Sequence, residues 1–298
     1  MHRTTALLGL SLLLAATLPA QIVDTLGGTA SAPTRQGMAK ANLFRVDKTV
    51  LLIKLEMYLN VPGAETLTFF RYRHHSQDGA YKLDWTKPVK VSGTGTGWYS
   101  AGTISVPLIE GNHYMLGVSW AGTLTYHYKT ASSGQAVSFG AWHRGVTPTG
   151  LPATYKISGV DIAQYYQRLS TIPIGKVVSV GKPCTSATSP RLVAATLPEI
   201  GKPFTLDLVE AQGSTPVIHL MNPNPALPTP IPIFGCTFWL NPVKGPLLLF
   251  TQVTDVSGTA TLSLPIPGDP WLAGLVMTWQ SAVAGKTIPL TNAIQGTL

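Results

Sequence analysis

The chain has 298 residues, of which 45% are hydrophobic and only 11% charged, and its formal net charge is +8. About 25% of the residues of an average domain are charged, and disordered chains combine high charge with few apolar residues, so this composition excludes a mainly disordered protein. The 29 glycines and 24 prolines interrupt helices and mark turns, which argues against a helical bundle or coiled coil.

Residues 1–20 have the pattern of a secretory signal peptide. Arg3 supplies the positive start, residues 6–14 are apolar apart from one glycine and one serine, and Leu18-Pro19-Ala20 places a small residue at the cleavage site. The alternative, a transmembrane anchor, needs about 20 apolar residues, and this apolar core is shorter. We therefore expect cleavage after Ala20 and a secreted protein without a transmembrane segment, located outside the cell, in the periplasm or on the cell surface.

Alternating apolar and polar residues predict half-buried strands along the first half of the chain. The alternation is clearest in residues 51–59, 112–120 and 123–129, and turns rich in Gly, Pro and Asp separate these stretches. Residues 160–169 are the one stretch with a helical pattern, and their Tyr165-Tyr166 pair fits a strand about as well.

Three short motifs in the first half look like functional sites but lack the neighbours that such sites need. The serine of Gly117-Val118-Ser119-Trp120-Ala121 lies inside an alternating strand, whereas a nucleophile elbow needs a strand-to-helix turn. Gly93-Thr94-Gly95-Thr96-Gly97 lacks the spacing of a dinucleotide-binding loop. His74-His75 has no third ligand nearby except Asp78, so we expect solvated loop histidines and no metal.

A glycan-acting hydrolase would need two carboxylates that face each other across a cleft. The candidates in the first half are Glu56, Asp84 and Glu110. Because the acidic residues are few and scattered, we expect no enzyme and no cofactor, and a hydrolase remains a remote alternative.

The aromatic residues of the first half divide by strand phase. The residues on the apolar phase, expected in the core, are Trp98, Tyr114, Trp120, Tyr126 and Tyr128. The ligand-binding candidates, which follow the polar phase or flank a turn, are Tyr58, Tyr81, Trp85, Tyr99 and His127. Exposed rings beside hydrogen-bonding groups would form a stacking platform for sugars, so a carbohydrate-binding module is an alternative function. The simpler explanation is that some of these residues are ordinary surface tyrosines and that a second sheet packs over these faces.

The composition changes near residue 181. Residues 21–181 contain 15 Lys and Arg against 8 Asp and Glu, whereas residues 182–298 contain five of each. All 10 tyrosines precede this point, and prolines cluster after it. We therefore expect two domains, residues 21–175 and residues 181–298, joined by a short link that contains Gly and Pro.

The second half continues the strand pattern. Residues 204–208 and 262–266 alternate, and the continuous apolar run at residues 246–250 predicts a strand buried on both faces. Short strands between Gly and Pro turns indicate an all-β chain with two β-sandwich domains in tandem, connected as jelly rolls or Greek keys.

The chain has two cysteines, Cys184 and Cys236, and no pair with the spacing of a zinc site. An even number of cysteines in an exported protein favours one disulfide, because secretory compartments are oxidising. Two buried free thiols are the alternative.

The second half contains five short motifs in order: Gly181-Lys182-Pro183-Cys184, Gly201-Lys202-Pro203-Phe204-Thr205-Leu206, Gly235-Cys236, Leu264-Pro265-Ile266-Pro267 and Leu290-Thr291-Asn292-Ala293. With these motifs, residues 181–298 resemble a C-terminal β-domain of secreted planctomycete-type proteins of unknown function. The resemblance implies that the two cysteines pair, and it implies no activity and no catalytic residues. The stretch that is Gly-rich in that family is replaced here by residues 185–189.

The first half is more loosely similar to jelly-roll accessory domains of surface proteins. The matching runs are Gly97-Trp98-Tyr99-Ser100, residues 104–108 and Glu110-Gly111-Asn112-His113-Tyr114. This similarity is one of fold and implies no ligand.

Together these features predict an exported, non-enzymatic structural or binding protein at the cell surface or outside the cell. The positive balance of the first half favours a glycan or an anionic envelope polymer as the partner. Lysines and arginines are spread singly, and even the densest group is modest beside a true basic patch, so we do not expect nucleic acid binding. That group consists of Arg71, Arg73, Lys82, Lys87 and Lys90.

Overall fold

The computed structural model describes residues 21–33, 38–93, 95–158, 161–174, 176–184, 189–233, 235–269, 272–285 and 288–298. Every regular element within these ranges is a β-strand, which confirms the all-β prediction. The stretch at residues 160–169, left open between helix and strand, contributes to strands β14 and β15. The predicted signal peptide, residues 1–20, lies outside the described residues.

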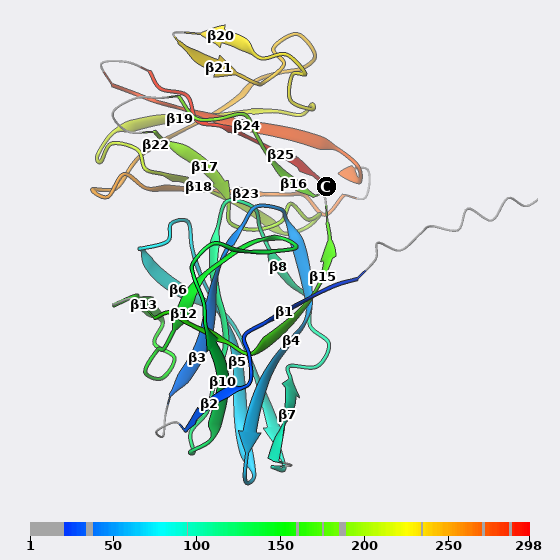
Figure 1. Cartoon of the computed structure of the whole chain (residues 1–298). Helices are drawn as coiled ribbons and strands as arrows, with labels where there is room; N and C mark the ends of the chain where they lie inside the picture. The colour runs from blue at the N-terminus through cyan, green and yellow to red at the C-terminus, as the bar shows by residue number, and fades with distance from the viewer. Residues whose placement is uncertain are drawn as a thin grey trace, which may run out of the picture.

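The strands up to Pro173 form two antiparallel sheets, which we call the N-terminal sandwich (Figure 1). The members of the eight-stranded sheet are β1 (Ile22–Leu26), β2 (Ala30–Pro33), β4 (Val50–Val61), β7 (Gly95–Ser100), β8 (Val106–Leu108), β10 (Thr125–Thr130), β14 (Ala163–Tyr165) and β15 (Gln167–Pro173). Its order is β1-β15-β4-β10-β14, with β7 and β8 along the other edge of β4 and β2 along β10.

The second sheet of this sandwich has seven strands. In spatial order they are β11 (Gln135–Val137), β12 (Gly140–Val146), β3 (Ala39–Val46), β9 (His113–Ser119), β5 (Glu65–His74), β6 (Ala80–Val91) and β13 (Thr154–Lys156). Ser119 ends strand β9, so the motif around it is part of a strand, as expected.

The alternation along β4 builds the core of the N-terminal sandwich. Leu55, Met57 and Leu59 are fully buried and face the other sheet, where Phe44 and Phe69 belong to the same core cluster. Each such side chain contributes about 1.5–3 kcal/mol relative to an exposed position. The residues between them point to the opposite face, because successive strand residues alternate. One face of the eight-stranded sheet is therefore left for polar and aromatic groups.

The strands from Val177 onward form the C-terminal sandwich. Its five-stranded sheet has the order β16 (Val177–Val180), β25 (Ala293–Thr297), β24 (Val276–Val283), β19 (Pro216–Asn222) and β22 (Leu248–Val253). Its three-stranded sheet consists of β17 (Arg191–Ala194), β18 (Pro203–Val209) and β23 (Ala260–Pro265), and β20 (Ile231–Ile233) and β21 (Cys236–Phe238) form a separate hairpin. Phe204, Leu206 and Trp279 lie in the core between the five-stranded and the three-stranded sheet.

Cys184 and Cys236 form a disulfide, as predicted, with their Cα atoms 5.1 Å apart. The bridge ties the segment after β16 to the β20–β21 hairpin, and both cysteines belong to a small core cluster with Phe238 and Leu240.

The apolar run at residues 246–250 was predicted to be buried on both faces, and this prediction is wrong. Strand β22 is an edge strand, and Leu249 on it is 63% exposed.

The two sandwiches stack end to end, and among the described residues no strand pairs across their junction (Figure 1). Asn112 donates a hydrogen bond to the Ala194 carbonyl (3.0 Å), and the Arg73 guanidinium lies 3.3 Å from the Asp207 carboxylate. Ile109 is buried in the core of the C-terminal sandwich. Strand β16 begins at Val177, ahead of the predicted domain start at residue 181.

His74 and His75 lie at this junction, which corrects the expectation of solvated loop histidines. Both side chains are partly buried, and their rings lie 4.0 Å apart. Arg191 of the C-terminal sandwich donates a hydrogen bond to the His75 carbonyl, and the His74 ring lies 5.5 Å from the ring of Tyr81. Within the described part of the chain, no group of three or more His, Cys, Asp or Glu residues could hold a metal ion.

Candidate functional site

Four aromatic side chains meet on the outward face of the eight-stranded sheet. Tyr58 comes from β4, Trp98 from β7, His127 from β10, and Tyr166 from the residue between β14 and β15. The Tyr58 ring centre lies 5.2 Å from that of Trp98, 4.9 Å from that of His127 and 5.0 Å from that of Tyr166. Trp98 and Tyr166 are 4.8 Å apart. We call these four residues the aromatic cluster.

Strand pairing brings the aromatic cluster together. Tyr58 lies between the buried Met57 and Leu59, so its side chain points outward. Trp98 is its cross-strand partner on β7. The Tyr166 backbone joins the other side, because its carbonyl accepts from the Tyr58 N–H (2.9 Å) and its N–H donates to the His127 carbonyl (2.8 Å). The rings meet at steep angles, as aromatic pairs prefer, so each one fixes the others.

A buried carboxylate with two cationic partners lies beside the aromatic cluster. Glu56 is only 4% exposed, and its oxygens lie 2.7 Å from Arg168 Nε and 2.9 Å from Lys54 Nζ. Burial raises the pKa of Glu56, but the hydrogen bonds from Arg168 and Lys54 outweigh it and hold the pKa below its usual value. The Arg168 guanidinium also covers the Trp98 ring at 4.4 Å. This contact joins the charged group to the aromatic cluster.

The arrangement offers both kinds of contact that a sugar ring needs. Half-buried aromatic rings present apolar surface to the C–H face of a sugar, and Arg168 and Lys54, held in place by the buried Glu56, present donors at its edge. The hydroxyls of Tyr58 and Tyr166 and the Trp98 indole N–H form no hydrogen bond to other residues in the described ranges. These groups are therefore available to sugar hydroxyls.

Two of the five predicted ligand-binding residues, Tyr58 and His127, meet in the aromatic cluster. Tyr81 and Tyr99 were expected to be exposed, and the structure corrects this, since they are 0% and 7% exposed. Their hydroxyls donate to backbone carbonyls, Tyr81 to Ser76 and Tyr99 to Gly95. Trp85 lies on the seven-stranded sheet and packs partly against the core.

One error in strand phase explains both the misplaced Tyr99 and the misplaced Trp98. In the glycine-rich strand β7, Tyr99 points inward and Trp98 outward, the reverse of the expectation. A strand with few apolar residues specifies its phase weakly. Tyr166 and Arg168 were not identified as candidates. The adjacent pair Tyr165-Tyr166 carried the signal, because neighbouring strand residues point to opposite faces and Tyr165 is buried.

Four other aromatic residues were expected in the core, and the structure places them differently. Tyr114 and Trp120 are buried as predicted, whereas Tyr126 and Tyr128 are only partly buried against that core. The Tyr126 ring packs against Lys40, whose Nζ lies 4.4 Å from the ring centre.

The three candidate carboxylates occupy separate places. Glu56 lies on β4, Asp84 lies on β6 with its carboxylate 2.7 Å from Arg71, and Glu110 lies in the loop between β8 and β9. Burial raises the pKa of Glu110, partly offset by a hydrogen bond from the Ser179 backbone.

No helix in the described ranges is long and apolar enough to span a membrane.

No family model matches the chain, and no curated protein matches it. The cryo-EM structure of T=3 Penaeus vannamei nodavirus is 14% identical, covers 100% of this chain and 96% of that chain, and has a TM-score of 0.16. The crystal structure of Parabacteroides merdae β-glucuronidase with glycerol in its active site is 10% identical, covers 80% of this chain and 27% of that chain, and has a TM-score of 0.14. With TM-scores this low, neither likeness carries an argument about this chain.

Proposed function

We propose that this chain is an exported, non-enzymatic protein of the cell surface or extracellular space that binds carbohydrate through the aromatic cluster. The observation that carries the proposal is the convergence of four rings from four chain segments on one outward sheet face, all within 4.8–5.2 Å of a neighbour. Rings that serve only as core would point inward, as Tyr99 does.

Preorganisation supports this use of the aromatic cluster. Its rings are fixed by mutual contact and by the Arg168 guanidinium over Trp98. A ligand that binds a rigid surface loses less of its interaction energy to ordering side chains. The two cations at Lys54 and Arg168 flank a single carboxylate at Glu56, so the site favours neutral or acidic sugars over cationic ligands.

Three features support export. The N-terminal twenty residues have the composition of a signal peptide. The disulfide between Cys184 and Cys236 is compatible with an oxidising compartment. The second half resembles a domain of secreted planctomycete-type proteins.

A glycan array with residues 21–298 tests the proposal. We expect saturable binding to at least one glycan class, and Trp98→Ala and Tyr58→Ala each to weaken it roughly three- to tenfold, because one aromatic contact contributes about 0.5–1.5 kcal/mol beyond its buried area. Trp85→Ala is the matched control, since Trp85 is a partly buried tryptophan of the same sandwich on the other sheet. It should bind like wild type. Absence of binding to every glycan class, or equal losses in Trp98→Ala and Trp85→Ala, would refute the proposal.

A further inference from the structure

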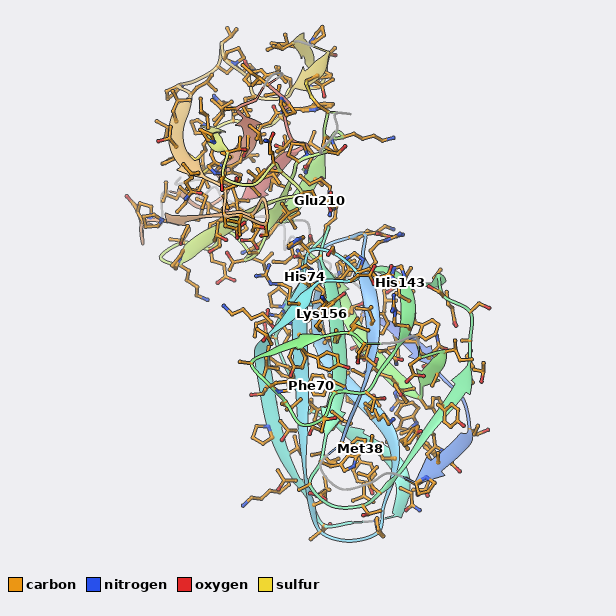
Figure 2. All side chains as sticks on the ribbon, turned by 90° about the vertical axis from the view of Figure 1, so that its left-hand side faces the viewer. Met38, Phe70, His74, His143, Lys156 and Glu210 are labelled. Carbon is orange, nitrogen blue, oxygen red and sulfur yellow. A yellow bond between two sulfur atoms is a disulfide. The ribbon has the colours of Figure 1, made fainter. Side chains whose placement is uncertain are left out.

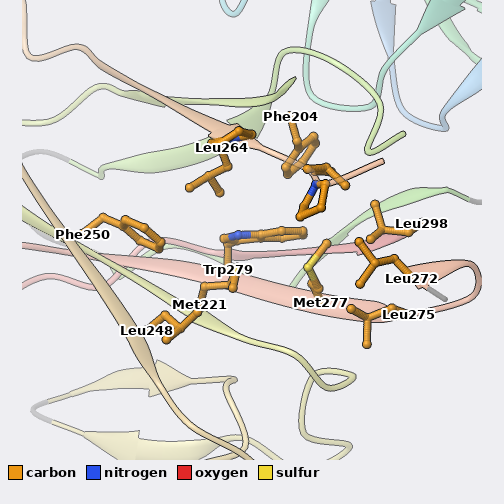
Figure 3. A pocket seen from close by; sticks show the side chains of 13 residues that line it. Phe204, Met221, Leu248, Phe250, Leu264, Leu272, Leu275, Met277, Trp279 and Leu298 are labelled. Atoms are coloured by element: carbon orange, nitrogen blue, oxygen red, sulfur yellow. The ribbon is translucent and has the colours of Figure 1, made fainter. Parts of the chain in front are cut away.

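The C-terminal sandwich contains an apolar cavity of about 310 Å³ between its two sheets (Figure 3). Phe204, Met277 and Trp279 form its buried floor, and Leu248, Phe250 and Leu264 form a half-exposed rim. A volume of this size lies at the lower end of the range for small-molecule sites, roughly 300–1,000 Å³.

The cavity lies where the two sheets end. Strand β22 is the edge strand of the five-stranded sheet and β23 that of the three-stranded sheet, and both contribute residues to the lining. Leu248 on β22 lines the cavity and is still 43% exposed. Toward the other end of β22, Gln252 donates a hydrogen bond to the Thr261 carbonyl on β23 and closes the edge. The exposed Leu248 therefore lies at the mouth of the cavity.

One polar group in the cavity wall has no partner. Trp279 is 1% exposed, and its indole N–H has no hydrogen-bond acceptor among the described residues. The edge of the indole that carries the nitrogen faces the space between Phe250 and Leu264 (Figure 3). A buried N–H without an acceptor costs free energy, and an acceptor on a ligand would remove that cost.

The lining decides the ligand class. A bound water needs two to four polar partners, and the indole is a single donor among leucine, methionine, phenylalanine and proline side chains, so the cavity suits an apolar group. One donor in an apolar wall matches a hydrocarbon chain that carries one acceptor. Among the described residues that line the cavity there is no cationic side chain to hold a carboxylate, which favours an ester over a free fatty acid.

We propose that the C-terminal sandwich binds an acyl ester, with its hydrocarbon chain in this cavity and its carbonyl oxygen accepting a hydrogen bond from the Trp279 indole. The site shares no residue with the aromatic cluster, so either proposal stands or fails without the other. The acyl group could belong to a free small ester or to a bilayer lipid.

The first test compares methyl octanoate with n-nonane in equilibrium dialysis against residues 21–298. We expect saturable binding of both, with the ester preferred roughly two- to tenfold, the value of one net hydrogen bond. Trp279→Phe keeps the apolar wall and removes the donor, so it should bind the two probes equally. Unsaturable uptake by the wild-type protein, or an unchanged ester preference in Trp279→Phe, would overturn the proposal.

A second pair of variants does not depend on the buried core. Leu248→Asp places a charge at the mouth of the cavity and should weaken methyl octanoate binding at least tenfold, whereas Leu249→Asp, the next residue on the same exposed edge and not part of the lining, should bind like wild type. Equal binding by the two variants would contradict the assigned site. Flotation with phosphatidylcholine vesicles distinguishes a bilayer lipid from a free ester as the source of the acyl group. If the source is a bilayer lipid, the wild-type protein floats with the vesicles and Leu248→Asp does not. If the source is a free ester, neither protein floats.

Discussion

Acidification from about pH 7.5 to about pH 5 is expected to destabilise the protein through histidines at the junction of the two sandwiches. His74 and His75 end strand β5 and begin the loop after it, and His113 lies opposite His74 on β9. His143 on β12 is 5.7 Å from His113, ring to ring. Figure 2 shows His74 and His143 at the end of the N-terminal sandwich nearest Glu210 of the other sandwich.

The magnitude follows from the two most perturbed side chains. Burial lowers the pKa of His75 to about 4, with His74 adding to the effect, and burial lowers the pKa of His113 to about 4, with His143 adding to it. The unfolded chain takes up protons near 6.5, where the folded chain does not, so the unfolded state binds more protons throughout this window. The free energy of unfolding is therefore highest above about pH 6.5, where both states are unprotonated at these histidines, and it falls as the pH drops toward 4. At about pH 5 the loss is roughly 2 kcal/mol for each of the two histidines.

Urea unfolding followed by tryptophan fluorescence measures this loss. We expect the His75→Gln/His113→Gln double variant to lose about 4 kcal/mol less than the wild-type protein between about pH 7.5 and pH 5, because His74, His143 and His219, whose pKa values burial also lowers, are present in both proteins. The range stays above the pKa window of Glu56, whose contribution is lost only at lower pH because its folded pKa is depressed. Parallel losses in the two proteins would refute the reasoning.

Three further predictions concern stability. Asn42→Ala should cost about 3 kcal/mol in urea unfolding, because the fully buried amide accepts from the Trp142 indole (3.0 Å) and its loss leaves that donor unpaired; unchanged stability would contradict this. Cys184→Ser/Cys236→Ser should be about 4 kcal/mol less stable than the oxidised wild type in urea unfolding, since the bridge closes a separation of 52 residues. The same variant should be as stable as the reduced wild type, and a variant as stable as the oxidised protein would contradict the prediction. Arg168→Met should cost about 2 kcal/mol by leaving the buried Glu56 with Lys54 alone, and adding Glu56→Gln should recover part of it; a double variant no better than the single one would show that the charge is not the cause.

Much of the fold could be predicted because strand alternation is local. Leu55, Met57 and Leu59 face inward while Glu56 and Tyr58 face outward, and both sets can be read from five consecutive residues. The method failed where that local contrast was weak. In β7, glycines around Trp98 and Tyr99 give no apolar pattern to set the phase, and the two side chains were assigned to the wrong faces. In β22, an apolar run was assigned to the interior although the strand lies at an edge.

The candidate site was only partly predictable, because its residues come from different strands. Tyr58 and His127 were candidates, but nothing in the sequence near them indicates Trp98 as a neighbour. Likewise, His74 and His75 read as loop residues, since their contacts with Tyr81 on the next strand and with Arg191 of the C-terminal sandwich depend on the tertiary structure.

By itself the sequence determined the all-β class and the cysteine pair, because apolar alternation, turn residues and cysteine number are local or compositional properties. Only the tertiary structure decided which side chains share a face, which strand lies at an edge, and where a core is left open. Those outcomes depend on strand order and on where each sheet ends, which arise from pairing between residues far apart in the chain. The aromatic cluster and the cavity at Trp279 are both products of that long-range pairing.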